Sequence, residues 1–153
     1  MKPAAAAFAL EDLTVGQSAS FDATISGGDI DAFAAISGDE SPLHIDAAFA
    51  RDRGYPDRVA HGAYLLALAS RLAGMYLPGR NALLLAMNVS FAAPVLIGAQ
   101  VTVSGVVDQV SDGVRSVVLR IRVMDSVTRE TFARGKLTVG FTDQGRVGNA
   151  SYG

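Results

Sequence analysis

The sequence predicts an α+β domain in which an antiparallel sheet wraps around one long, buried central helix. Residues 62–77 are mostly apolar and carry one charge, on Arg71, which is typical of a helix that is buried on nearly all sides. Long strands with one apolar face follow the break at Leu77-Pro78-Gly79. Such a sheet must cover its apolar face, and the helix supplies the cover.

The first part of the chain predicts a strand and two short helices. Phe21, Ala23 and Ile25 alternate with polar residues, so residues 18–25 are expected to form a strand. Ser26 and the acidic residue three positions later are typical of a helix start, and Gly38 is a typical helix end. Ser41-Pro42 predicts the start of a second helix.

The second part predicts a meander of strands. Residues 82–96 form the first, and a slip in the apolar phase at residues 105–107 predicts a bulge in the second. Ser111-Asp112-Gly113 is a hairpin signal. The last two strands each alternate apolar and cationic residues, with apolar faces formed by Val117, Leu119, Ile121 and Val123, and by Ala133, Gly135, Leu137, Val139 and Phe141.

Length and composition predict one domain. The chain has 153 residues, 50% of them hydrophobic, which suits a single core. We expect a flexible N-terminal segment at 1–9, the domain at 10–142 and a flexible C-terminal tail at 143–153. An open sheet edge and a helix covered on one side both favour pairing with a second copy, so a homodimer is expected.

Several classes of function are excluded by composition. A net charge of -2 argues against a nucleic-acid partner, and no apolar run is long enough for a membrane span. The absence of cysteine excludes disulfides and thiolate chemistry. We therefore expect a cytoplasmic protein without cofactor or metal. Five arginines could meet the phosphates of a bound carrier or form a solvated face: Arg51, Arg53, Arg58, Arg71 and Arg80.

Asp39 and His44 are the candidate catalytic residues. They lie five positions apart in a turn-rich segment, and such a pair can hold one water between a carboxylate and an imidazole, as hydration or dehydration requires. The alternatives are a turn-closing aspartate and a half-buried helix histidine. His61, the second histidine, is interpreted as structural, fixing the start of the long helix. Asp46 completes no recognisable metal-ligand spacing with these residues.

The segment Gly38-Asp39-Glu40-Ser41-Pro42-Leu43-His44 resembles the motif of the MaoC-like (R)-specific enoyl-CoA hydratases, a family with the hot-dog fold. The likeness covers roughly residues 15–141. It includes the flanking segments Ala32-Phe33-Ala34-Ala35, Ala47-Ala48-Phe49-Ala50, Val59-Ala60-His61-Gly62, Leu77-Pro78-Gly79, Val89-Ser90-Phe91 with Pro94-Val95, and Gly98.

The resemblance implies a role for each matching residue. Asp39 and His44 would hold the water that attacks C3 of a 2-enoyl thioester, and the Gly62 N–H would act as the oxyanion donor. Ser70 matches a family serine that lies near the aspartate, and it would steady Asp39. Ser41 stands where the family has asparagine, and serine can cap the following helix equally well.

The resemblance further implies an acyl-thioester substrate, carried on CoA in preference to acyl carrier protein. The expected reaction is (R)-specific hydration of trans-2-enoyl-CoA to (R)-3-hydroxyacyl-CoA, or the reverse dehydration. Two alternatives stay open: a hot-dog acyl-CoA thioesterase, in which the water attacks the carbonyl carbon, and a non-catalytic acyl-thioester binding module.

Overall fold

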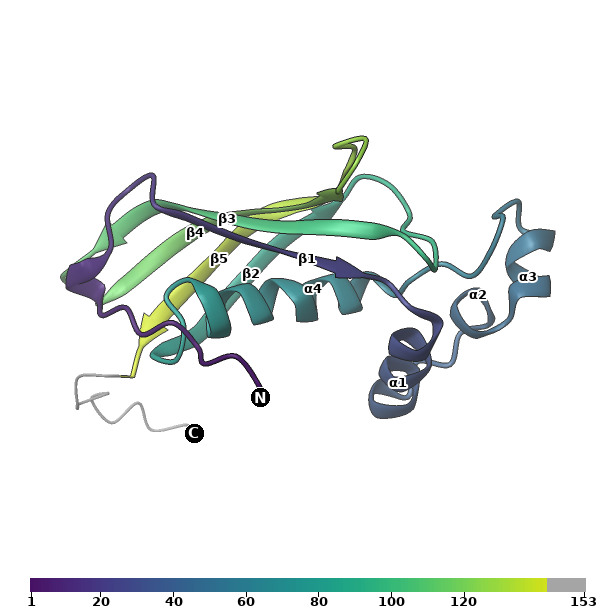
Figure 1. Cartoon of the computed structure of the whole chain (residues 1–153), viewed down its shortest axis with the longest axis horizontal. Helices are drawn as coiled ribbons and strands as arrows, with labels where there is room; N and C mark the ends of the chain where they lie inside the picture. The colour runs from purple at the N-terminus through teal and green to yellow at the C-terminus, as the bar shows by residue number, and fades with distance from the viewer. Residues whose placement is uncertain (143–153) are drawn as a thin grey trace.

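The structure of the chain, a computed structural model, describes residues 1–142 and contains one antiparallel sheet of five strands (Figure 1). The strand order is β1-β3-β4-β5-β2, so β1 and β2 are its edges. The strands are β1 (Ser18–Thr24), β2 (Ala82–Phe91), β3 (Gln100–Ser111), β4 (Ser116–Asp125) and β5 (Thr131–Phe141).

Helix α4 (Gly62–Arg71) packs on one face of this sheet and continues into the π-helical turn η2 (Leu72–Tyr76) (Figure 1). Leu72 is fully buried against the sheet at Gly105. A Cβ atom at Gly105 would lie 2.5 Å from Leu72 Cδ2, so the glycine on β3 allows the helical segment to approach this closely. The predicted sheet-on-helix arrangement is confirmed.

The strand patterns also follow the prediction. The apolar faces predicted for β4 and β5 point to the core, whereas Arg120, Arg122, Arg134 and Lys136 are exposed on the other face. The register shift in β3 falls between Val107 and Gln109, next to the predicted bulge.

Helix α4 is covered on one side, as the dimer expectation assumes, and not on nearly all sides as its composition alone predicts. Leu65, Leu68 and Ala69 pack into the core, but Ala63 and Ala67 on the opposite side are exposed. One five-stranded sheet covers a helix from one side only, and no other described element covers the rest. The apolar composition of α4 therefore exceeds what this chain buries.

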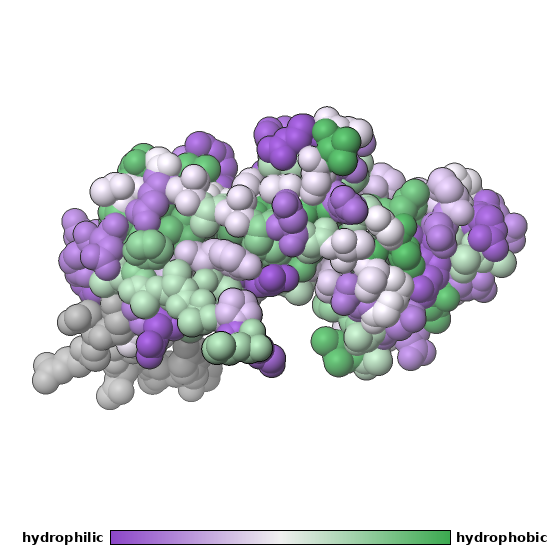
Figure 2. All heavy atoms as spheres, viewed as in Figure 1, coloured by the Kyte–Doolittle hydropathy of each residue, from purple (hydrophilic) through white to green (hydrophobic). Residues whose placement is uncertain are grey.

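Three helices form a lobe beside the sheet: α1 (Gly27–Ser37), α2 (Pro42–Ile45) and α3 (Ala47–Asp52) (Figure 1). The predicted limits of α1 are confirmed. Ser26 Oγ accepts from the Asp29 N–H at 3.0 Å, the Asp29 carboxylate accepts from the Ser26 N–H at 3.2 Å, and Gly38 ends the helix in the left-handed region (φ 75°). In the space-filling view this lobe projects beyond the sheet–helix body (Figure 2).

The N-terminal segment makes a backbone contact with η2. Within the N-terminal segment, the Ala6 N–H donates to Met75 O at 2.9 Å, and Leu10 is the first fully buried side chain. Flexibility of residues 1–9 stays a prediction, and the predicted tail at 143–153 lies outside the described residues. Within residues 1–142 no helix combines the length and the apolar character that crossing a membrane requires.

Candidate functional site

Asp39 lies on an exposed turn between α1 and α2. The left-handed conformation of Gly38 turns the chain out of α1, and the Asp39 N–H then donates to Ser37 Oγ at 3.1 Å. The Asp39 carboxylate accepts the N–H of Ser41 at 3.3 Å. The turn thus fixes the carboxylate locally while leaving it open to a ligand.

His44 lies on α2 and is half-buried. Its Nδ1 is 2.7 Å from the carbonyl oxygen of Val59. A carbonyl can only accept a hydrogen bond, so Nδ1 carries the hydrogen and the neutral ring keeps its lone pair on Nε2. His44 therefore presents a basic nitrogen whose orientation is fixed from the opposite side of the ring.

His61 immediately precedes α4 and is 1% exposed. Its side chain makes no capping hydrogen bond, so His61 does not fix the helix start as a cap. Its Nε2 instead donates to the backbone carbonyl of Asp39 at 2.8 Å. The ring also stacks on His44, with centroids 3.9 Å apart and planes inclined by 30°. His61 therefore connects the Asp39 turn, the His44 ring and the first turn of α4.

The three side chains converge on one small space. One nitrogen or oxygen atom from each of Asp39, His44 and His61 lies within 4.8 Å of the others. A metal bound by both imidazoles would need both lone pairs aimed at one point about 2.0–2.1 Å from each nitrogen. The two rings pack against each other with planes inclined by 30°, so their lone pairs lie in two different planes. The geometry suits a shared water better than an ion.

Gly62 opens α4 directly after His61. The first N–H groups of a helix have no partner within the helix, and the Gly62 N–H has none among the described residues. It borders a cavity of about 330 Å³. The cavity is lined by Ala60, Gly62, Leu65, Phe91 and residues 92–95.

Phe91 contacts this site although sequence reasoning did not select it as a candidate. A Cβ atom at Gly62 would lie 3.1 Å from Phe91 Cζ, so the ring closes over the helix start. The sequence feature that could have indicated Phe91 is its place in Val89-Ser90-Phe91, one of the segments that resemble the family. Phe33 packs on the other side, with its ring centroid 5.0 Å from that of His61.

The two supporting serines behave differently from expectation. Ser41 precedes α2 and Pro42 is the first helical residue, as predicted, but the Ser41 side chain makes no capping hydrogen bond. Ser41 acts through its backbone N–H to Asp39 and its carbonyl, which accepts from the His44 N–H at 2.9 Å. Ser70 is exposed on α4, about 12 Å along the helix from Gly62 at 1.5 Å per residue. The supporting role of Ser70 stays a prediction.

The arginines considered for carrier phosphates do not form one group. Arg58 pairs with Asp31 at 2.6 Å. Arg53 lies over the ring of Phe49, and Arg71 lies over the ring of Phe21, at 4.8 and 4.3 Å from the respective centroids. Three of the five thus have partners on three different elements.

Tyr64 is the titratable group on α4 nearest to this site in sequence. Burial raises the pKa of its phenol, and the negative charge of Asp29 adds to the effect, so Tyr64 stays neutral near pH 7. It packs edge-on against Phe33, with ring centroids 5.7 Å apart. Tyr64 therefore contributes an aromatic packing contact rather than a charge.

The fold and site together define a class: a sheet-on-helix domain with a carboxylate–imidazole pair beside the open N–H of its central helix. Residues 12–128 match the sequence model of the MaoC like domain, and the chain belongs to this family. Its hot-dog fold is the one predicted from the sequence.

Individual relatives agree with this assignment. The chain is 39% identical over 92 residues to the (R)-specific enoyl-CoA hydratase of Aeromonas caviae, covering 60% of this chain and 69% of the relative. It is 40% identical over 103 residues to the (R)-specific enoyl-CoA hydratase of Rhodospirillum rubrum, covering 65% of this chain and 72% of the relative. It is 40% identical over 88 residues to a 3-hydroxybutyryl-CoA dehydratase of Methylorubrum extorquens, covering 58% and 56%.

Solved structures give the same fold. The (R)-hydratase of A. caviae involved in PHA biosynthesis superimposes with a TM-score of 0.82 at 31% identity, covering 86% of this chain and 99% of that one. An unliganded R-hydratase of Pseudomonas aeruginosa also gives 0.82, at 28% identity, covering 95% and 96%.

Replacing each histidine by phenylalanine in turn tests the two histidine-to-backbone hydrogen bonds of the site one at a time. His61→Phe keeps the ring but removes the donor to Asp39 O, so we expect the free energy of unfolding to fall by about 1–3 kcal/mol. We also expect faster amide hydrogen exchange at Ser41, whose N–H bonds the Asp39 carboxylate. The matched variant His44→Phe removes the donor to Val59 O and should instead speed exchange at Val59, which bonds Leu43 O. Equal exchange at Ser41 in both variants would contradict the role of His61.

Proposed function

We propose that this chain catalyses the (R)-specific hydration of trans-2-enoyl-CoA to (R)-3-hydroxyacyl-CoA, or the reverse dehydration, as a hydro-lyase. The observation that carries the proposal is the convergence of Asp39 and His44 beside His61, one residue before the open N–H of Gly62. A water-activating pair and a carbonyl-binding donor are the two parts that this reaction requires. The names of the A. caviae and R. rubrum relatives support the substrate class and the stereochemistry.

The paired side chains would activate one water. Nε2 of His44 accepts a proton from the water, while the Asp39 carboxylate accepts a hydrogen bond from the other O–H and orients the water. The water oxygen forms a bond to C3 of the thioester. The π electrons of the C2=C3 bond move toward the carbonyl. C2 then takes up the proton held by His44, on the same face of the double bond as the added oxygen. Addition on one face gives one product hand.

The start of α4 would stabilise the charge that develops. As C3 is attacked, negative charge moves to the thioester carbonyl oxygen. The Gly62 N–H donates to this oxygen, and the positive end of the helix dipole adds to the effect. The cavity beside Gly62 and Phe91 is the space where the thioester lies.

The substrate is carried on CoA in preference to acyl carrier protein, as the names of the A. caviae and R. rubrum relatives indicate. Ser70 remains a supporting residue only if a second chain brings it to a site. The expectation that the protein is cytoplasmic stays a prediction.

We further propose that the chain acts as a homodimer. Edge strand β2 leaves Leu85 56% and Phe91 52% exposed, and one face of α4 has no cover among the described residues. A second copy that extends the sheet at β2 would bury these groups and pair the free strand edge.

Asp39→Asn and His44→Gln should each lower kcat for crotonyl-CoA hydration by about 10²–10⁴-fold, because each removes part of the water-activating pair. The loss of enoyl absorbance measures the reaction. The control Asp112→Asn changes an exposed aspartate on the β3–β4 hairpin and should leave the rate unchanged. Release of free thiol without loss of the double bond would contradict the hydratase and favour the thioesterase. Unchanged rates in both site variants would remove this mechanism.

The oxyanion role of Gly62 can be isolated because proline suits the first position of a helix. His61 has φ -58° and ψ 133°, which a following proline accepts. Gly62→Pro therefore removes the N–H with little change to the helix and should lower kcat by about 10²–10³-fold. Gly62→Ala adds a methyl group near Phe91 but keeps the N–H, so it should retain more activity than Gly62→Pro. The reverse order would show that space, rather than the donor, matters at this position.

Dimer formation through β2 should be sensitive to charge at Leu85. Leu85→Glu is expected to weaken association at least about tenfold, because a buried carboxylate would lack a partner. Sedimentation equilibrium measures the mass in each case. Val127→Glu, at the exposed turn between β4 and β5, is the matched control and should leave the mass unchanged. A monomeric wild-type chain at micromolar concentration contradicts the proposal.

A further inference from the structure

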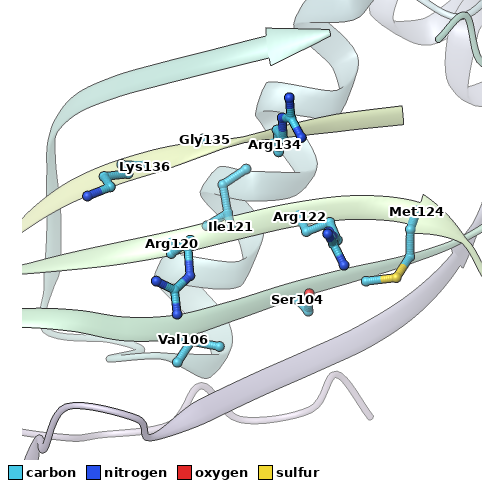
Figure 3. Close-up of a pocket in the computed structure, with 9 residues that line it drawn as sticks. All are labelled: Ser104, Val106, Arg120, Ile121, Arg122, Met124, Arg134, Gly135 and Lys136. Carbon is cyan, nitrogen blue, oxygen red and sulfur yellow. The ribbon is translucent and has the colours of Figure 1, made fainter. Parts of the chain in front are cut away.

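The face of the sheet that points away from α4 carries a second cavity, of about 470 Å³ (Figure 3). Four cationic side chains project around it from β4 and β5, and helix α4 lies behind the sheet in this view. These residues are Arg120, Arg122, Arg134 and Lys136. The chain as a whole has a net charge of -2, whereas the charge of this face is positive.

Two of the four cations share one carboxylate. Arg120 and Lys136 both bond Asp108, each at 2.8 Å. The hydrogen bond from Lys136 lowers the pKa of Asp108, so this carboxylate is ionised near pH 7. The group of three residues keeps one net positive charge.

The other two cations have no carboxylate partner among residues 1–142. Arg122 and Arg134 occupy directly opposite positions on β4 and β5. Like charges in this relation destabilise a sheet pair. Ser104 is opposite Arg122 on one side, and Ser90 is opposite Arg134 on the other. Four adjacent strands therefore present a row of hydrogen-bond donors in which no residue is acidic.

The cavity also has an apolar part. Val106 and Met124 line it beside the cations, and Met124 is buried although it lies on the outer face. A hollow of several hundred Å³ with apolar lining and a few converging polar groups is typical of sites for small molecules. The concave shape favours such a ligand over the flat contact of a protein partner.

We propose that this face binds a phosphate-bearing ligand of nucleotide size. Two forked guanidinium groups that start from directly opposite strand positions can each bond the oxygens of a phosphate or diphosphate, and the Ser104 hydroxyl that lines the cavity supplies a further donor. The apolar or planar part of the ligand then packs on Val106 and Met124. This cavity shares no lining residue with the one at Gly62, so the site is separate from the proposed thioester site.

Calorimetric titration of the whole chain with ADP and with pyrophosphate tests the site. We expect both to bind the wild-type chain at low ionic strength, ADP more tightly because its base can use the apolar part. Arg122→Gln/Arg134→Gln should weaken both by about tenfold or more, because the charge-assisted hydrogen bonds are lost. The control Lys2→Gln/Arg129→Gln removes the same charge from exposed positions elsewhere and should change affinity by no more than about twofold.

Three results with the wild-type chain and the double variant would overturn the proposal. The first is no binding of either probe to the wild-type chain at millimolar concentration. The second is nucleotide binding that survives in Arg122→Gln/Arg134→Gln, which would place it elsewhere, including the proposed thioester site. The third is a change in the mass of the chain in solution on this double substitution, which would make the face an interface between copies. If the double variant does not fold, the single variants Arg122→Gln and Arg134→Gln replace it, and each should weaken binding. If both single variants bind the probes as tightly as the wild-type chain does, the proposed site is overturned.

Discussion

The hydrogen bond from His61 to the backbone of Asp39 is the contact on which the site depends. Asp39 belongs to an exposed turn in the lobe of short helices, and such a turn has few contacts to hold it in place. His61 belongs to the buried start of α4, which the sheet fixes. The 2.8 Å hydrogen bond from His61 Nε2 to Asp39 O attaches the turn to the buried start of α4. The contact between the His61 and His44 rings attaches α2 to the same point. The carboxylate and the imidazole are thus held at a fixed separation.

This arrangement also explains why both histidines have defined tautomers. Each ring donates one N–H to a backbone carbonyl, His44 to Val59 and His61 to Asp39. The two remaining nitrogens differ in environment, since that of His61 is buried without a partner whereas His44 is only half-buried. The chain therefore assigns a supporting role to one imidazole and leaves the other as the candidate base.

The sheet separates two chemical environments. Its inner face packs on α4 and directs the helix start toward the cavity lined by Gly62 and Phe91. Its outer face carries cationic side chains at neighbouring positions of adjacent strands. The alternation of each strand requires only that these positions be polar. A solvated face gains nothing from two arginines placed opposite each other, so this arrangement needs a physical explanation of its own. A bound anion supplies one.

Local sequence determined most of the elements of this protein. Ser26, Asp29 and Gly38 determined the limits of α1, because capping and left-handed turns involve residues a few positions apart. The alternation in β4 and β5 determined which side chains are buried. The motif from Gly38 to His44 supplied the candidate pair, since both residues lie in one short segment.

Contacts between distant segments were decided only by the tertiary structure. His61 was interpreted from its place before a helix, yet its partner is the carbonyl of a residue 22 positions earlier. The approach of Phe91 to Gly62, the opposition of Arg122 and Arg134 and the uncovered face of α4 depend on strand register and packing. No local pattern encodes these, because register fixes which residues face each other only after the sheet has formed.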